Sequence, residues 1–261
     1  SGRYLREGAA RLGLAAAIQE CAVNLSHDPQ CTGCGYCNLT CGYLRKRSVL
    51  QTYLPDAAAL ARAGTGALRI LVGRKVLGVD FATGSLRARG VRLRCRNAPE
   101  GPLEFLQGRS VVLCAGAIAS SAILHRSHAL RELDLPIGER FSFNFGSPIH
   151  ADFDAPVRAF DGLQIAHYYD GDLPDGGFVI ETWYNPPGQQ SLALPGWMDE
   201  HEANLRRYVN YACAAPLVGS SPRSRIDVPF LAPGERIHVS LRDRDLDRLK
   251  AGMLRTCELF F

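Results

Sequence analysis

The stretch SVVLCAGAIASSAILHRS, residues 110–127, places a run of aliphatic residues directly before a glycine and a helix-forming segment. A near-continuous apolar run is typical of a strand that is buried on both faces of a parallel sheet. Gly116 stands where such a strand would turn into a helix, and ligands of open α/β sheets bind outside the carboxyl ends of the strands. The stretch therefore predicts a buried central strand that delivers a ligand site at Gly116.

Two segments upstream of this stretch carry the alternating pattern of strands. They are LRILVGRKVLGVDF (68–81) and SLRARGVRLRCR (85–96), and turn residues separate them. Together with GRSVVLCAG (108–116) they predict a three-stranded stretch. In VRLRCR (91–96) apolar residues alternate with arginines. We interpret this basic face as solvated, because no aromatic residues interleave as platforms for nucleic-acid bases.

The rest of the chain divides into helical and sheet-forming segments. Apolar residues at helical spacing predict helices over 3–21 and 48–63. Beyond Pro148, short aromatic-rich segments broken by glycine and proline predict an antiparallel sheet. Two more helices are expected, near 198–213 and from about 243 to the end. The expected fold class is a mixture of α/β and α+β structure.

Length and composition indicate a globular protein. The chain has 261 residues, of which 46% are hydrophobic, enough for a sizeable core in one or two domains. The formal net charge of +4 is small and does not indicate a nucleic-acid partner. The apolar run at 111–119 is too short for a transmembrane helix, which needs about 20 residues, so we expect no transmembrane segment. The sequence GAIAS (116–120) lacks the G-x-S-x-G pattern of a hydrolase.

The segment CTGCGYCNLTCGY (31–43) contains four of the nine cysteines, namely Cys31, Cys34, Cys37 and Cys41. Glycines between them allow the chain to wrap around one point. The spacing C-x2-C-x2-C-x3-C is that of bacterial ferredoxins and favours an iron–sulfur site, whereas a zinc ribbon would need a second, separated pair. Disulfides and unligated packing thiols are the alternatives.

Glu181 is the candidate catalytic residue. In FVIETWYN (178–185) its carboxylate has aromatic and apolar neighbours. Such surroundings raise the pKa of a carboxyl group and suit a base or a group that orients a substrate hydroxyl. Strand alternation would equally allow this side chain to point outward or into a salt bridge. Trp183, Tyr184 and Trp197 are expected either to line a hydrophobic pocket or to pack in the core.

Residues 110–127, the cysteine segment and RKRSVLQTYLPDAAA (45–59) together resemble the glucose-methanol-choline (GMC) family of flavin oxidoreductases, over most of the chain. FVIETWYNPP (178–187) and LPGW (194–197) are similar to the substrate domain of the branch with sterol and long-chain alcohol oxidases and related bacterial dehydrogenases. The chain departs from the family signature at 128–130, where glycine, an aliphatic residue and glycine are expected. The positions that match the flavin signature are Gly116, Ala117, Ser120, Ser121, Ile123, Leu124 and Ser127.

This resemblance implies FAD as the cofactor and hydride transfer from a substrate hydroxyl to FAD as the reaction, with a hydrophobic alcohol as the expected substrate. It implies a partial, Rossmann-like FAD-binding domain over 1–146 and an antiparallel-sheet substrate domain with helices over 147–261. The backbone around Val76 is expected near the adenine. Ala115 and Gly116 are expected near the ribose and the pyrophosphate, because small residues let a backbone approach a cofactor closely.

The resemblance also bears on the cysteines. Family members whose sugar-dehydrogenase subunits carry a three-iron cluster space their cysteines like Cys31, Cys37 and Cys41, and such a cluster would relay electrons to an acceptor protein. Two family motifs, an amino-terminal G-x-G-x-x-G and a carboxyl-terminal segment with the catalytic histidine, do not occur in the chain. We therefore expect a central fragment that is inactive alone. The alternative hypothesis is a non-catalytic iron–sulfur or zinc module that acts in electron transfer or assembly with a partner subunit.

Overall fold

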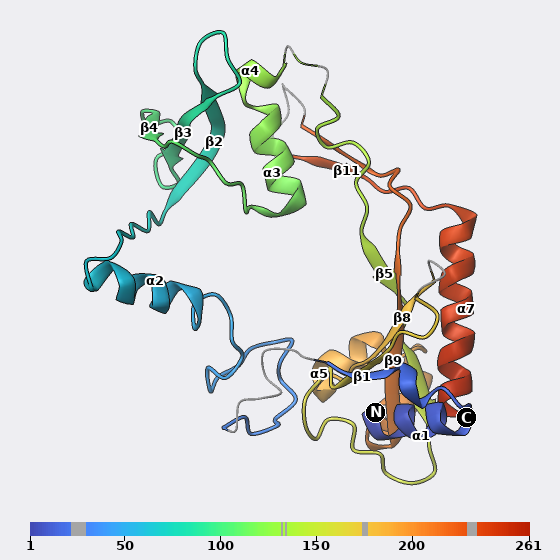
Figure 1. Ribbon diagram of the computed structural model, residues 1–261. Helices are drawn as coiled ribbons and strands as arrows, with labels where there is room; N and C mark the ends of the chain where they lie inside the picture. Colours follow the sequence, from blue (N-terminus) through green and yellow to red (C-terminus); the bar gives the residue numbers. More distant parts are fainter. Residues whose placement is uncertain (22–29, 132, 134, 174–176, 229–233) are drawn as a thin grey trace. The chain divides into compact units, whose positions relative to one another are not determined.

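A computed structural model describes the chain as two compact units (Figure 1). Unit 1 comprises Ser1–Leu68, Asn144–Ser220 and Asp243–Phe261, and unit 2 comprises Arg69–Phe143 and Ser221–Arg242. The structure describes residues 1–21, 30–131, 133, 135–173, 177–228 and 234–261. None of the helices within these residues is long and apolar enough to cross a membrane.

Unit 1 is built on a six-stranded sheet in which every described pairing is antiparallel. Its central strand is β9 (Tyr211–Gly219), in which Ala214 and Leu217 each have a partner on both sides. β9 pairs with β8 (Val179–Thr182) on one side and with β5 (Asn144–Gly146) and β6 (Ile149–Asp152) on the other. The antiparallel sheet predicted beyond Pro148 is confirmed. The strands are β1 (Ile18–Glu20), β5 (Asn144–Gly146), β6 (Ile149–Asp152), β7 (His167–Tyr169), β8 (Val179–Thr182) and β9 (Tyr211–Gly219).

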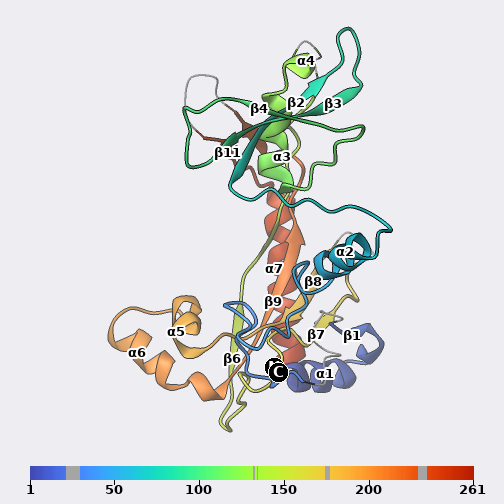
Figure 2. The ribbon, with the colours of Figure 1, turned by 90° about the vertical axis from the view of Figure 1, so that its left-hand side faces the viewer.

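Two helices, α1 (Gly2–Arg11) and α7 (Asp243–Phe260), cover one face of this sheet (Figures 1 and 2). Leu5 of α1 and Leu259 of α7 are fully buried against sheet residues such as Ile180. The two helices lie so close that a Cβ atom on Gly8 would stand 1.6 Å from the carbonyl oxygen of Leu259. The absence of a side chain at Gly8 therefore sets how closely the first and last helices pack.

Three helices predicted in unit 1 are shorter than the sequence pattern indicated. The first ends at Arg11, because Gly13 takes a positive φ of 72° and the chain then turns into β1. The helix predicted near 198–213 is α6 (Asp199–Arg206), because the apolar residues from Tyr211 onward belong to β9. The helix predicted over 48–63 is α2 (Tyr53–Arg62), which begins five residues later than the pattern indicated. The other short elements of unit 1 are α5 (Pro187–Gln190), η1 (Ala15–Ala17), η2 (Ser191–Ala193) and η3 (Tyr208–Asn210).

Unit 2 combines an antiparallel sheet in the order β2-β3-β4 with a helix, α3, that packs on β2. The buried Ser127 hydroxyl joins the two, since it accepts a hydrogen bond from Val79 N at 2.9 Å and donates one to Ile123 O at 2.7 Å. The elements are β2 (Arg74–Phe81), β3 (Ala88–Cys95), β4 (Glu104–Gln107), α3 (Gly116–His125), α4 (His128–Arg131), β10 (Arg225–Asp227) and β11 (Arg236–His238).

The buried central strand predicted before Gly116 is wrong for this structure. The third strand of the unit 2 sheet is β4, and residues 110–114 are irregular, with Val112 81% exposed. Extended backbone needs neighbouring strands for its N–H and C=O groups, and none of the described strands pairs with these residues. The predicted mixture of helices and antiparallel sheets is confirmed, whereas the functional domains 1–146 and 147–261 stay a prediction.

The close contact at Gly8 makes a testable prediction for stability. We expect Gly8→Ala to lower the free energy of unfolding by about 1–3 kcal/mol, because the added methyl group forces α1 away from α7. The matched control is Gly66→Ala, since a Cβ atom there would meet nothing within 4 Å. The control should stay within about 1 kcal/mol of wild type. Denaturant unfolding measures the free energy of unfolding of both variants. Equal decreases in Gly8→Ala and Gly66→Ala would contradict the packing argument.

Candidate active site

The three positions predicted to approach the cofactor all lie in unit 2. Val76 is half-buried in β2, opposite Leu93 of β3. Ala115 and Gly116 stand at the start of α3, the helix that packs on β2. The strand and the helix that carry these residues thus belong to one packed body.

The start of α3 is open. Gly116 has a φ of 76°, which by itself favours glycine, and a Cβ atom placed there would meet nothing within 4 Å. Ala115 precedes the first turn and makes no side-chain cap, so the first N–H groups of this ten-residue helix lack a side-chain acceptor there. Unpaired amides and the helix dipole favour an anionic group. This end of the helix therefore fits a pyrophosphate.

In unit 1, Glu181 lies on the face of the sheet that is opposite to α1 and α7. It pairs with Ala215 of β9, and His150 of β6 pairs with Cys213, two residues away on the same strand. Directly paired residues share a face, and so do alternate residues of one strand. Glu181 and His150 therefore project from the same face on either side of β9. Trp183, two residues after Glu181, packs edge-on against the His150 ring, with the ring centroids 6.1 Å apart.

Buried amide side chains form a series of hydrogen bonds that links His150 to the cysteine segment. Gln190 contacts His150 Nε2 at 2.5 Å, and its Oε1 accepts a hydrogen bond from Asn185 N at 2.9 Å. The Asn185 side chain accepts hydrogen bonds from Gln164 and, at 3.3 Å, from Asn38. Gln164 Oε1 in turn accepts a hydrogen bond from Asn38 N at 2.7 Å. These contacts fasten the cysteine segment to the sheet.

The same hydrogen bonds determine the protonation state of His150. Because Gln190 Oε1 accepts from the Asn185 amide, the Gln190 nitrogen must face the imidazole and donate to its Nε2. His150 then carries its proton on Nδ1 and is neutral. Burial lowers the pKa of His150, in agreement with this assignment. We conclude that this histidine is held as a neutral ring.

Two acidic groups lie on this face. Asp152, two residues beyond His150 on β6, pairs with Arg207, whereas Glu181 has no such partner among the described residues. The Glu181 carboxyl is half-buried, and it forms no hydrogen bond or ion pair within the part of the chain that the structure describes. Burial raises the pKa of Glu181. The predicted apolar environment is therefore present. Salt-bridging, one alternative open at the level of sequence, is not seen among the described residues.

An apolar pocket of about 280 Å³ lies beside the cysteine segment in unit 1. The rings of Phe160 and Tyr208 stack in its wall with centroids 5.3 Å apart, and the Tyr208 hydroxyl donates to Asn185 O at 2.8 Å. Of the aromatic residues expected in a pocket, Tyr184 is buried against Tyr208, and Trp197 is 80% exposed. The lining residues are Cys34, Gly35, Tyr36, Phe160, Pro186, Pro187 and Tyr208.

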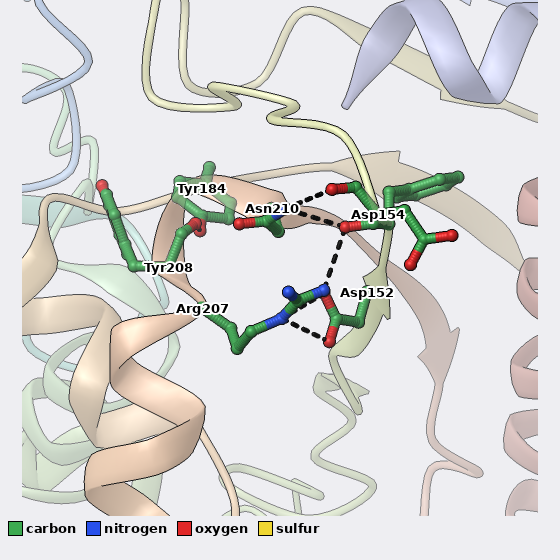
Figure 3. Close-up of polar contacts among 7 residues, drawn as sticks. Asp152, Asp154, Tyr184, Arg207, Tyr208 and Asn210 are labelled. Carbon is green, nitrogen blue, oxygen red and sulfur yellow. Dashed lines mark hydrogen bonds and ion pairs between the residues drawn. The ribbon is translucent and has the colours of Figure 1, made fainter.

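Polar contacts hold the Tyr208 segment in place (Figure 3). Arg207 donates to both carboxylate oxygens of Asp152, at 2.7 to 3.1 Å, and to Phe153 O at 3.1 Å. Asn210 donates to Phe153 O at 2.8 Å and to Asp154 O at 3.2 Å. Hydrogen bonding to Asp152 raises the pKa of the Arg207 guanidinium. The turn before β9 is thereby fastened to the end of β6, which fixes the aromatic wall of the pocket.

The four cysteines of residues 31–41 line one small cavity of about 20 Å³. All four are free thiols. Among the described residues, no group of three or more histidine, cysteine or acidic side chains is arranged to hold a metal ion. The chain thus gathers the sulfurs in one place without the convergence that a metal site requires, and the predicted ligation by Cys31, Cys34, Cys37 and Cys41 stays a prediction.

Cys41 differs from the other three in its hydrogen bonds. Its Sγ accepts the backbone N–H groups of Lys46, at 3.2 Å, and Arg45, at 3.1 Å. These amides, that of Lys46 above all, lower the pKa of the Cys41 thiol. Leu44 takes a positive φ of 54° in the turn that aims both amides at the sulfur.

The structure adds residues that sequence reasoning missed. His150 had no distinguishing motif, and the amides of Gln164, Asn185 and Gln190 are buried by tertiary contacts between segments far apart in the sequence. The one available signal was the presence of Asn185, Gln189 and Gln190 shortly after the aromatic pair at 183–184. The roles of Glu181 and of the three predicted cofactor positions stay predictions.

No curated protein matches this chain. The family model described as GMC oxidoreductase matches residues 2–144, which is more than half of the chain. The match includes the cysteine segment, residues 45–59 and residues 110–127, the three segments that together carry the sequence resemblance. The chain therefore belongs to the GMC oxidoreductase family, a family of FAD-dependent oxidoreductases.

Proposed function

We propose that this protein oxidises a hydrophobic alcohol, and that Glu181 accepts a hydrogen bond from the substrate hydroxyl. The observation that carries the proposal is a half-buried carboxyl group with a raised pKa and no partner among the described residues. Its neighbour across the sheet, His150, is already engaged by Gln190. Glu181 is thus the acidic group on this face that is available to a ligand.

The aromatic surroundings of Glu181 support a hydrophobic substrate. Trp183 lies on the same face, and the apolar pocket beside Tyr208 has the lining that binds alkyl or ring carbons. A carboxylate that accepts a hydrogen bond in such surroundings fixes the direction of the hydroxyl and of the carbon that carries it. We propose that Glu181 positions the hydroxyl while apolar residues of unit 1 hold the carbon skeleton.

FAD, when bound, supplies the acceptor of the hydride. The residues of unit 2 that would hold it are Ala115 and Gly116, which leave the start of α3 open for the pyrophosphate, and Val76, which would border the adenine. The amides of the first turn of α3 would bind phosphate oxygens.

The electron acceptor and the iron–sulfur relay stay predictions from the sequence. The geometry of the four cysteines gives the relay no support, because they do not form a metal-binding group in the described structure. The alternative of a non-catalytic metal module has no observation in its favour for the same reason. We therefore restrict the proposed function to alcohol oxidation with FAD.

Anaerobic reduction of the flavin by alcohols tests this function. We expect hydrophobic alcohols to bleach the oxidised flavin absorption of the full-length protein, and Glu181→Gln to lower the rate constant at least about 100-fold. The matched control is Glu202→Gln, an exposed residue of α6 that pairs with Arg206. An unchanged rate in Glu181→Gln would remove this residue from the site. A flavin that no alcohol reduces would contradict alcohol oxidation itself.

The raised pKa of Glu181 makes a second prediction that is independent of activity. A carboxyl whose pKa is higher in the folded state binds more protons there, so the free energy of unfolding falls as pH rises through its titration range. Glu181→Gln removes this loss of stability, so its free energy of unfolding should exceed that of wild type at neutral pH. The difference between the two proteins should narrow at pH values below the ordinary pKa of glutamate. Denaturant unfolding at neutral and acidic pH, with Glu202→Gln as the control, measures the gap. A less stable Gln variant at neutral pH would show that the carboxylate is well solvated or paired.

Gly116 makes a third prediction, for cofactor binding. We expect Gly116→Ala to weaken FAD binding at least about tenfold, because the methyl group and the strained φ disturb the start of α3. Gly84→Ala is the matched control, since Gly84 lies in the β2–β3 turn with a similar φ of 69° and equally open space. Titration with FAD, followed by fluorescence, compares the two variants. Equal losses of FAD affinity in the two variants would mean that backbone strain, not proximity to the cofactor, explains the effect.

A further inference from the structure

We propose that His150 donates its Nδ1–H group to a second oxygen of the substrate, several carbon atoms away from the hydroxyl that Glu181 holds. The substrate class is then hydrophobic alcohols that carry a further oxygen acceptor, such as an ether, on the carbon skeleton. This inference rests on the proposed function and names the residue that selects among alcohols. All the contacts that support it lie in unit 1.

His150 presents one hydrogen-bond donor. The Gln190 amide nitrogen donates to His150 Nε2, so the ring proton lies on Nδ1. No described residue accepts a hydrogen bond from this Nδ1. Nor does it belong with the partnerless side-chain nitrogens of the described residues that are shielded from solvent, which include both ring nitrogens of His167. The Nδ1–H group is therefore unpaired and open to a ligand.

Three contacts fix the direction of this donor. The His150 ring packs edge-on against Trp183 and Tyr211, with centroid distances of 6.1 and 6.0 Å, and Gln190 holds its Nε2. Gln190 is itself fully buried, and Asn185 N donates to its Oε1 at 2.9 Å. The N–H group is thus oriented before a ligand arrives, which lowers the entropic cost of binding. A ligand that covers it without supplying an acceptor leaves a buried donor unsatisfied and binds more weakly.

The face that carries His150 also carries one unpaired acceptor. The Glu181 carboxylate accepts hydrogen bonds and has no partner among the described residues. Asp152, the other acidic group on this face, pairs with Arg207 at 2.7 Å. A ligand that lies across β9 therefore meets a free acceptor on the β8 side and a free donor on the β6 side.

The spacing of the two groups requires two oxygens on the ligand. Glu181 pairs with Ala215 and His150 pairs with Cys213, on opposite sides of β9. Strands about 4.8 Å apart and a rise of about 3.4 Å per residue put the Cα atoms of Glu181 and His150 about 12 Å apart. Side chains stand roughly perpendicular to a sheet, so one oxygen does not reach both groups with hydrogen bonds of about 2.8 Å. Two oxygens separated by several carbon atoms do.

Alcohols of equal length, with and without an ether oxygen, test the proposal. The probes are 1-octanol, 2-pentyloxyethanol, 4-propoxybutan-1-ol and 6-methoxyhexan-1-ol. The concentration dependence of anaerobic flavin reduction gives the Kd of each probe for the full-length, FAD-loaded protein. We expect 4-propoxybutan-1-ol or 6-methoxyhexan-1-ol to gain affinity relative to 1-octanol, by about tenfold more in wild type than in His150→Phe. The oxygens of 2-pentyloxyethanol are too close together, so it should show no such gain.

Two further variants separate the donor from the shape of the ring. His150→Asn carries an N–H donor as many bonds from the backbone as Nδ1 and should keep the preference for the ether. His128→Phe, at an exposed histidine of α4, is the matched control and should behave as wild type. A preference that survives in His150→Phe, or that His150→Asn loses as well, would overturn the proposal. So would a gain for 2-pentyloxyethanol alone, because it would contradict the spacing.

The same probes distinguish this inference from the proposed function. If 1-octanol reduces the flavin and no ether shows the preference, alcohol oxidation stands and the role of His150 is overturned. If no probe reduces the flavin, alcohol oxidation itself is contradicted. Calorimetric titration of the same proteins with the same probes then gives the Kd values, and the criteria above decide the role of His150.

Discussion

Strand β9 is the constraint on which the arrangement of unit 1 depends. It hydrogen-bonds to β8 on one side and to β5 and β6 on the other, so its register decides which residues of three other strands share a face. Ala212, Ala214 and Val218 turn toward the helices, and Cys213 and Ala215 turn the opposite way, toward His150 and Glu181. A slip of one residue in this pairing would exchange the two sets and bury a glutamate in the helix-covered core. The position of the candidate acid is thus a consequence of backbone pairing.

Periodicity along the chain correctly located several helices and strands. The terminal helix α7, the helix α2 and the strands β2 and β3 all lie within the segments that periodicity indicated. The predictions failed where tertiary pairing decides. The composition of residues 110–114 predicted a strand, but a strand also needs neighbouring strands to pair with. Residues 207–213 were predicted to be helical, although 211–213 belong to β9 of the sheet. Periodicity describes a side-chain pattern and contains no information about which backbone will pair with which.

The candidate site divides in the same way. Single residues suggested the candidate chemistry, a glutamate in an aromatic strand and four closely spaced cysteines, and these roles stay predictions. What could not be read was the buried amide chain, in which Gln164, Asn185 and Gln190 connect His150 with Asn38. Each of these residues looks ordinary in its own segment, and the arrangement arises only when four distant segments meet. Amide side chains suit this task because each both donates and accepts without carrying charge.

The contact between α1 and α7 has a consequence for how the polypeptide acquires its structure during synthesis. Leu5 and Ala9 are synthesised more than 200 residues before Leu259 and Phe260, which pack against them in the same core. Until then the apolar stripe of the first helix and one face of the sheet have no cover. Contacts of such long sequence separation slow folding and leave intermediates that are prone to aggregation. The apolar face of α1 should therefore stay open to chaperones until α7 has been synthesised.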